Sequence, residues 1–234
     1  MANILEVQGI HTYIGQFHIL EDVSFDVPQG SVTVLLGRNG AGKTTTLRSI
    51  MGLWKPAQGK LNFNGVSLIG KPAYEIAQLG IGYVPEHRAI FRQLSVAENL
   101  KIAERKQGQL DQRIGRIFGL FPDLERLYNW PAGQLSGGQQ QMLAIARALV
   151  PENSLLLIDE PSEGLAPVLI QQMMDAIRQL ADYTTILLVE QNFRVASQLG
   201  RQYAIIENGQ SVHFGLMEDL IDNEELIQHY LGAA

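Results

Sequence analysis

One stretch constrains this 234-residue chain more than any other: residues 37–44 read GRNGAGKT and fit the pattern G-x-x-x-x-G-K-[ST] at every fixed position. The stretch follows an apolar, β-branched run at 31–36 and precedes a helical pattern at 45–53. A strand that turns through glycines into a helix points backbone N–H groups into an anion-sized cup, at the positive end of the helix dipole. The sequence therefore predicts a phosphate-binding loop rather than a glycine-rich turn without a ligand.

Two side chains of this loop are expected to act directly on a bound nucleoside triphosphate. Lys43 reaches the β- and γ-phosphates as a point charge, and the Thr44 hydroxyl ligates Mg²⁺. The predicted nucleotide contacts of the loop are Gly37, Arg38, Asn39, Gly40, Ala41, Gly42, Lys43, Thr44 and Thr45.

The composition narrows the class of protein. A hydrophobic content of 46% and a charged content of 18% are ordinary for a globular chain, and the length fits one α/β domain, with or without a subdomain. The net charge of −6 argues against broad attraction to nucleic acid or to an anionic membrane surface. The sequence contains no cysteine, which excludes disulfides, thiolate metal sites and cysteine nucleophiles.

Neither a leader peptide nor a membrane span is predicted. The opening residues MANILE lack a basic region followed by an apolar core, and no apolar run approaches the roughly 20 residues that cross a bilayer. If the protein works at a membrane, we expect it to do so from the cytoplasmic side, through partners.

The order of the predicted elements indicates an α/β fold. Residues 3–8 and 17–27 alternate between apolar and polar side chains, which predicts antiparallel strands, and the segment 60–68, with Asn64-Gly65 inside it, predicts a hairpin. Further strands are predicted at 31–36, 81–84, 155–158, 185–189 and 203–206, and helices at 168–182 and 224–231. Continuous apolar strands that alternate with helices favour a parallel sheet covered on both faces.

The pattern becomes helical between residues 87 and 150. Residues 95–98, SVAE, form a capping box, and Asp111 is expected to cap a helix whose apolar residues recur at helical spacing as far as Pro122. We therefore predict a helical subdomain at 87–150, inserted into a core formed by 1–86 and 151–234.

A pair of carboxylates follows the buried strand 155–158. Ligands collect at the carboxyl edge of parallel sheets, so we expect Asp159 to hold Mg²⁺ and Glu160 to orient or deprotonate a water molecule aimed at the γ-phosphate. The alternative is a pair of solvated acids at a strand end, and the phosphate loop upstream disfavours it.

Residues 135–139, LSGGQ, predict a second anion site. Ser136 is a natural N-cap for the helix that follows, and Gly137 and Gly138 leave the amides of the first turn uncovered. A capped helix without a ligand explains Ser136, but it does not explain the whole pentapeptide.

Together, the phosphate loop, LSGGQ and Asp159-Glu160-Pro161 resemble an ATP-binding cassette (ABC) ATPase over essentially the whole chain. The resemblance implies a P-loop NTPase (RecA-like) core with a parallel sheet, an N-terminal antiparallel β-subdomain and an inserted α-helical subdomain. It also implies ATP and Mg²⁺ as cofactors, and a head-to-tail homodimer or a heterodimer with a second ABC ATPase. Each ATP then lies between the phosphate loop of one subunit and Ser136, Gly137, Gly138 and Gln139 of the other.

Two single residues and one loop depart from the usual pattern of the family. Glu86 replaces a glutamine, Gln191 replaces a switch histidine, and the loop 161–167 reads PSEGLAP instead of ending in Leu-Asp. With the closing residues 230–232, YLG, these departures resemble the LivF-like ATPase subunit of branched-chain amino acid importers, a group with relatives for neutral amino acids and urea.

The chemistry of Glu86 and Gln191 does not fix the hydrolysis rate. Glu86 can still ligate Mg²⁺ or its water shell, and Gln191 can donate a hydrogen bond to the γ-phosphate and hold the water. Gln191 cannot become a cation as histidine can, so reduced hydrolysis is possible, as is a plain role as a polar strand-end residue.

The resemblance also implies contacts at the two ends of the nucleotide site. For the adenine we expect Tyr13, although strand alternation turns it away from the usual position at residue 14 unless a bulge intervenes, and packing is the alternative. The region Glu86 to Leu100, with Ile90 and Phe91, is where the family docks its integral membrane permease subunits, although burial explains Leu94 equally well. A solute-binding protein is then an indirect partner, and the chain is peripheral on the cytoplasmic face of the plasma membrane.

The leading hypothesis is the ATPase subunit of an amino acid importer. A urea or small-solute importer and a nucleotide-gated interaction module with weak hydrolysis are the alternatives. A soluble ABC protein acting on ribosomes or DNA is disfavoured by the acidic charge and by the lack of a second cassette or a long coiled coil, so no nucleic acid partner is expected. A phosphate-loop kinase or GTPase would leave Ser136-Gly137-Gly138 without a role.

Overall fold

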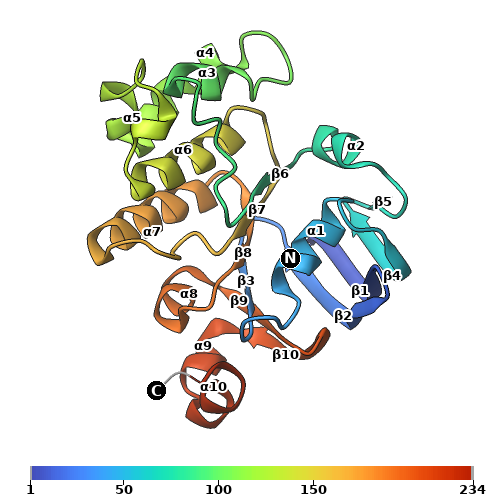
Figure 1. The fold of residues 1–234 in the computed structure, drawn as a ribbon. Helices are drawn as coiled ribbons and strands as arrows, with labels where there is room; N and C mark the ends of the chain where they lie inside the picture. Colours follow the sequence, from blue (N-terminus) through green and yellow to red (C-terminus); the bar gives the residue numbers. More distant parts are fainter. Residues whose placement is uncertain (1, 233–234) are drawn as a thin grey trace.

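The computed structural model describes residues 2–232 and arranges them around one ten-stranded sheet, in the order β5-β4-β1-β2-β10-β9-β3-β8-β7-β6 (Figure 1). The strands are β1 (Asn3–Ile14), β2 (Phe17–Pro28), β3 (Val32–Leu36), β4 (Pro56–Phe63), β5 (Val66–Ser67), β6 (Ile81–Val84), β7 (Leu155–Asp159), β8 (Thr185–Val189), β9 (Gln202–Glu207) and β10 (Gln210–Leu216). The helices are α1 (Lys43–Ile50), α2 (Ala73–Gln78), α3 (Val96–Lys101), α4 (Gln109–Leu120), α5 (Pro122–Arg126), the 3₁₀ turn η1 (Ala132–Gln134), α6 (Gly137–Leu149), α7 (Pro167–Ala181), α8 (Phe193–Leu199), α9 (Met217–Ile221) and α10 (Glu224–Leu231).

Half of this sheet is parallel. Strands β9, β3, β8, β7 and β6 run in the same direction, and every residue of β3, β7 and β8 is buried. Strands that are buried on both faces read as continuous apolar runs, which is the pattern that the sequence shows. The predicted parallel α/β core is therefore confirmed.

Alternate residues of the parallel strands feed two separate cores. On β3, Val32, Val34 and Leu36 pack into the core that contains α6, α7 and α8, whereas Leu35 packs into the other core, with α1, α2 and the antiparallel strands. The sheet thus separates two hydrophobic layers, as the period of two along a strand requires.

The remaining strands form the predicted antiparallel β-subdomain. Strands β1, β2, β4 and β5 pair antiparallel, and the single parallel bridge between Gln210 and Asp22 joins them to the rest of the sheet through β10. Asn64 and Gly65 have φ of 49° and 75°, as a type I′ hairpin turn requires, so the hairpin predicted around them is confirmed.

The helical elements α3 to α6 lie between β6 and β7, at the top of Figure 1, and confirm an inserted helical segment. Its boundaries at residues 87 and 150 stay a prediction. The capping box at Ser95 is present, with the Glu98 amide donating to Ser95 Oγ at 3.1 Å and the Ser95 amide donating to Glu98 Oε2 at 2.7 Å.

The expectation that Asp111 caps the next helix is wrong. Helix α4 begins two residues earlier, with Gly108 as its N-cap at φ 85°, and Asp111 lies inside the first turn. In the first turn, the Leu110 amide donates to Glu104 Oε1 at 2.8 Å, and just before the helix the Arg105 amide donates to Gln109 Oε1 at 2.8 Å. The first turn thus has a side-chain acceptor other than Asp111.

Several further elements were not predicted from the sequence. They are the short helices α2, α5, α8 and α9, the 3₁₀ turn η1, and the strand β10, which follows β9 through a turn at Asn208 and Gly209 and pairs with it antiparallel.

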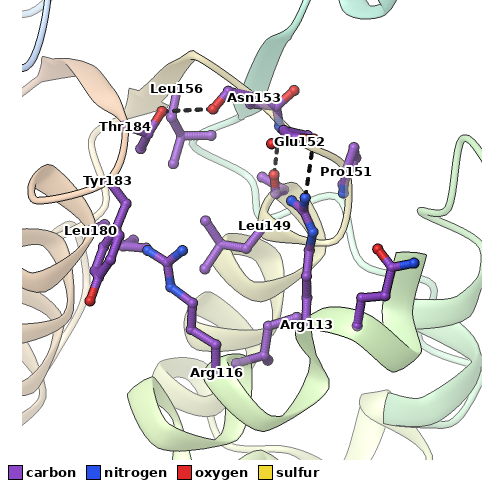
Figure 2. Close-up of a pocket in the computed structure, with 13 residues that line it drawn as sticks. Arg113, Arg116, Leu149, Pro151, Glu152, Asn153, Leu156, Leu180, Tyr183 and Thr184 are labelled. Atoms are coloured by element: carbon purple, nitrogen blue, oxygen red, sulfur yellow. Dashed lines mark hydrogen bonds and ion pairs between the residues drawn. The ribbon is translucent and has the colours of Figure 1, made fainter. Parts of the chain in front are cut away.

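Side chains of α4 tie the helical segment to the core at the amino ends of β7 and β8 (Figure 2). Arg116 lies over the Tyr183 ring, 3.6 Å from its centroid, and Arg113 Nη2 lies 3.4 Å from Glu152 Oε2. The contacts border a cavity of about 370 Å³ whose floor includes Ile117, Leu149 and Leu156. This cavity is at the edge of the sheet opposite to the phosphate loop.

We predict that Arg116 and Tyr183 stabilise the junction as a pair. A cation over an exposed aromatic ring contributes about 0.5–1 kcal/mol, and the gain should vanish when either partner is removed. Urea denaturation of Arg116→Ala, Tyr183→Ala and the double variant gives the coupling energy of the pair. Purely additive effects of the two substitutions would show that the contact contributes nothing to the free energy of unfolding.

Candidate nucleotide site

The carboxyl ends of four parallel strands meet at one edge of the sheet. Leu35 pairs with Val189, Asp159 pairs with Val189 and Val84 pairs with Ile158, so β3, β8, β7 and β6 end in register. The phosphate loop follows β3, Glu86 follows β6, Glu160 follows β7 and Gln191 follows β8. The register therefore places most of the predicted site residues at the same edge.

The phosphate loop leads from β3 into α1, and two of its glycines allow no side chain. Gly42 is the N-cap of α1 at φ 110°, and a Cβ atom there would lie 2.8 Å from Leu20 Cδ2. A Cβ atom on Gly37, at φ 147°, would lie 2.2 Å from the Ile206 carbonyl oxygen. The loop can approach β2 and β9 this closely only because both residues are glycines.

Lys43 is held by the loop itself. Its side chain is 3% exposed, and its ammonium donates to the carbonyl oxygens of Gly37 at 2.8 Å and of Arg38 at 3.1 Å. Glu160 Oε1 lies 3.4 Å from the same nitrogen. Phosphate oxygens of a bound nucleotide would replace these carbonyl and carboxylate acceptors. The Lys43 ammonium is therefore already positioned where the loop would bind phosphate.

Asp159 is fully buried and accepts two hydrogen bonds. The Thr44 hydroxyl donates to Oδ1 at 3.0 Å, and the Tyr83 hydroxyl donates to Oδ2 at 3.2 Å. The pKa of Asp159 is raised to about 6, mainly by burial and also by the negative charges of Glu160 and Glu86, while the two hydrogen bonds act in the opposite direction. The predicted pair of Asp159 and Thr44 is thus in direct contact, with Glu86 near enough to act on the same carboxyl.

These oxygen donors suit a hard cation such as Mg²⁺. Mg²⁺ is usually held by one or two carboxylates, with phosphate oxygens and water completing an octahedron. Residues 2–232 contain no cluster of three or more histidine or acidic side chains that could hold a metal alone. The donor set therefore fits a cation that arrives with the nucleotide.

Glu160 and Gln191 are brought together. Glu160 has the left-handed φ of 44°, and Gln191 Nε2 donates to its Oε2 at 2.5 Å. The amide of Glu160 donates to the Val189 carbonyl oxygen at 3.0 Å, which fixes the turn after β7. With Lys43 on its other oxygen, the Glu160 carboxylate lies between a cation and an amide donor.

The residues of LSGGQ are not joined to the phosphate loop of the same chain. Ser136 caps α6 through a capping box, with the Gln139 amide donating to Ser136 Oγ at 3.3 Å and the Ser136 amide donating to Gln139 Oε1 at 3.0 Å. A Cβ atom on Gly138 would lie 2.4 Å from Leu169 Cδ1. The predicted N-cap is confirmed, and Ser136 and Gly137 at the amino end of α6 are exposed.

Tyr13 lies near the end of the β1–β2 hairpin. The strand register shifts between Thr12 and Tyr13, so the irregularity that the expectation for Tyr13 requires is present. The Tyr13 ring is 45% exposed and stacks on His18, with 4.1 Å between centroids. Phe17, which pairs with Ile14, is 64% exposed. The contact of Tyr13 with adenine stays a prediction.

Comparison with known proteins agrees with this geometry. Residues 20–163 match the family model described as ABC transporter. The chain is 40% identical over 232 residues to the high-affinity branched-chain amino acid transport ATP-binding protein BraG of Pseudomonas aeruginosa, covering 98% of this chain and 100% of that protein. The chain belongs to the ABC transporter family of ATP-binding proteins. It is thus an ATPase that binds ATP or ADP and couples ATP hydrolysis to transport.

Solved cassettes share the fold. The ADP conformation of the cassette MJ1267 superposes with a TM-score of 0.86 at 25% identity, over 100% of both chains. The cassette MJ0796, solved as a dimer, gives a TM-score of 0.79 at 25% identity, over 91% of this chain and 98% of that one. ABC cassettes dimerise. Every helix of this cassette within residues 2–232 is too short or too polar to span a membrane.

In this cassette the segment after Glu86 is hydrogen-bonded to α3. The buried Asn99 side chain accepts from the Phe91 amide at 2.9 Å and donates to the Phe91 carbonyl oxygen at 2.9 Å. Ile90 packs against the core, Leu94 is half-buried, and the Phe91 ring is 46% exposed with the Arg147 guanidinium 4.9 Å from its centroid. Only part of the predicted apolar cluster is therefore accessible.

Glu190 is a residue that sequence reasoning missed. Its carboxylate is 1% exposed and accepts from the Ser162 hydroxyl at 2.9 Å, the Ser162 amide at 3.2 Å and the Asn192 amide at 3.4 Å. It thereby links the loop after Glu160 to the loop that carries Gln191. An acid directly after a continuous apolar strand was the available signal. Tyr83 on β6 was also missed, although its hydroxyl donates to Asp159 at the end of the neighbouring strand β7.

Glu190 should make the stability of the cassette depend on pH. Burial raises its pKa from 4.5 to about 7, so the folded state binds more protons than the unfolded state between these values, and stability falls as the pH rises through this window. In Glu190→Gln this loss is absent, so the variant should gain about 3 kcal/mol relative to the unmodified protein between pH 4.5 and 8. Urea denaturation across this range measures the gain, and parallel curves for the two proteins would contradict it.

Proposed function

We propose that this cassette is the ATP-hydrolysing subunit of an importer for branched-chain or other neutral amino acids. The observation that carries the proposal is the 40% identity to BraG across the full length of that protein. The unusual residues Glu86 and Gln191, at the ends of β6 and β8, add support because they resemble the same group.

The arrangement supports hydrolysis by direct attack of water on the γ-phosphate. Glu160, held between Lys43 and Gln191, orients or deprotonates the water, and Gln191 donates to the γ-phosphate. Lys43 exchanges the loop carbonyl oxygens for phosphate oxygens. Thr44, Asp159 and Glu86 would hold Mg²⁺, which, when bound, neutralises charge on the phosphates.

A complete site requires a second subunit. The hydrogen bonds of Ser136 and Gln139 lie within the helical segment, which leaves the amino end of α6 available to a partner. We infer a head-to-tail dimer, either with a second copy or with a second ABC ATPase, in which Ser136, Gly137, Gly138 and Gln139 of one subunit cover the ATP of the other. Tyr13 is proposed to contact the adenine.

The permease subunits are proposed to dock along residues 86–100. Phe91 is exposed there, and a groove of about 310 Å³ beside it is lined by Tyr83, Pro85, Ala89 and Arg147. The free edge of β6 borders this groove, close to Glu86. Docking here would place the cassette on the cytoplasmic face of the plasma membrane, with a solute-binding protein as an indirect partner. A urea or related importer would use the same surface.

A second candidate is a nucleotide-gated module with weak hydrolysis. It is favoured by Gln191, which lacks the charge of a switch histidine and here donates to the catalytic carboxylate. In a working ATPase, Gln191→Ala should lower turnover in the assembled complex at least tenfold, because the γ-phosphate loses a donor. If turnover is close to the uncatalysed rate before and after the substitution, the module is the better description.

Substitution of Glu160 by Gln tests the proposed chemistry. The amide keeps the shape of the side chain but cannot accept a proton, so kcat should fall by about 10²–10⁴-fold while ATP binding persists and the dimer stays closed. Phosphate release and sedimentation in ATP measure the two effects. Glu152→Gln, a similar change at the opposite edge of the sheet, is the control. Unchanged hydrolysis in Glu160→Gln would remove Glu160 from the catalytic role.

A further inference from the structure

Two consecutive residues after Glu86 adopt a backbone conformation that L-amino acids rarely take. Arg88 and Ala89 have φ of 60° and 48°, and both are bound in tight turns. The Arg88 amide donates to the Pro85 carbonyl oxygen at 3.0 Å, and the Ala89 amide donates to the His87 carbonyl oxygen at 2.5 Å. This conformation turns the chain sharply just after β6.

The Arg88 side chain ends at the first turn of α6. A Cβ atom built on Gly137 would lie 3.4 Å from Arg88 Nη1 and 3.5 Å from Nη2. Gly137 is the first residue of α6 and directly follows the N-cap Ser136. The guanidinium group therefore lies against Gly137, one of the residues that we propose to cover the ATP of the other subunit.

The charge of Arg88 is unfavourable at this place unless an anion is bound. The amino end of α6 already carries the positive end of a helix dipole. Within residues 2–232 no hydrogen bond or ion pair engages the Arg88 guanidinium. The groove that it borders contains Arg105 and Arg147 but no carboxylate. Glu86, two residues earlier, lies 3.8 Å from His87 Nδ1 and raises the pKa of Asp159. Asp123, at the amino end of α6, is bonded to Arg126 and Gln139.

We propose that Arg88 is a phosphate-binding residue that acts in trans, on the ATP held by the phosphate loop of the other subunit. The inference rests on the proposed head-to-tail site. The LSGGQ segment offers only amide dipoles and a hydroxyl, whereas Arg88 adds a full charge that cannot be lost by deprotonation and can form two parallel hydrogen bonds to phosphate. It supplies the positive charge that Gln191 does not.

The same segment would connect the two sites of the dimer. Glu86 faces the metal side of the nucleotide site in its own subunit, and Arg88, two residues later, faces the site of the partner. A strained turn of three residues therefore joins them, so movement of Glu86 with the nucleotide is passed to Arg88 through the backbone.

The first test measures ATP binding and ATP-driven dimerisation separately, in the Glu160→Gln background that prevents turnover. Arg88→Ala should leave the affinity of the monomer for ATP within about twofold but weaken the ATP-bound dimer at least tenfold, with Arg88→Lys in between. Arg92→Ala removes a charge from the same loop and is the matched control, expected to change neither. Thermal denaturation verifies that each variant is folded.

The second test asks which subunit Arg88 serves. Arg88→Ala subunits are mixed with an excess of Lys43→Ala subunits, and their hydrolysis is compared with unmodified subunits in the same excess. If Arg88 acts in trans, both mixed dimers contain the same complete site, formed by an intact phosphate loop facing an intact Arg88, and their rates agree. If Arg88 acts in its own subunit, the first mixture has no complete site and its rate stays low.

Several results would overturn the inference. The first is an unchanged dimer affinity in Arg88→Ala, and the second is an equal loss of dimer affinity in Arg92→Ala. The third is weaker ATP binding by the Arg88→Ala monomer. The fourth is an effect confined to binding of the permease subunits, which would indicate that Arg88 binds an acidic segment in the groove. If the Glu160→Gln variant, with Arg88 intact, forms no ATP-dependent dimer, the proposed head-to-tail dimer of two copies is contradicted, and the inference about Arg88 is contradicted with it.

Discussion

The chemistry of this cassette depends on the register of four parallel strands. Strands β3, β8, β7 and β6 end together, and each leads into a segment that carries predicted site residues. Because side chains alternate between the faces of a strand, a slip of one residue in β7 would turn Asp159 and Glu160 each to the opposite face. The proposed metal ligand and the proposed catalytic base would then face the wrong neighbours. The two hydrophobic cores, which take alternate residues of these strands, prevent such a slip.

This edge concentrates charge that the protein alone does not balance. Asp159 and Glu190 are buried, and burial raises the pKa of both carboxyls, whereas Lys43 is buried and bound to carbonyl oxygens as well as to Glu160. Hydroxyl and amide donors offset part of the cost of removing these groups from water. The left-handed conformation of Glu160 adds strain at the same edge. In the proposed function, a nucleotide with its cation would balance these charges, so binding energy would be available to close the site.

Most of the fold and half of the site could be predicted from local sequence patterns. The phosphate loop, the strands of the parallel sheet and the carboxylate pair each depend on residues that are neighbours in the chain. Strand β10 could not be predicted in the same way, since its residues are mostly exposed or half-buried and give no apolar pattern. Asp111 does not have its predicted role, because the helix begins at Gln109, and Glu104, five residues before that start, accepts from the Leu110 amide of the first turn.

The residues that were missed depend on contacts between distant parts of the chain. Glu190 is recognisable as a structural acid only once Ser162, 28 residues away, is seen to donate to it. Arg88 is a different case, because its significance comes from what surrounds it: it ends at Gly137 and has no acid beside it in the groove. If, as proposed, the phosphate that it binds lies in another subunit, its charge is balanced only in the dimer. An unbalanced charge in the isolated subunit would then be a physical sign of dimerisation that a single chain can carry.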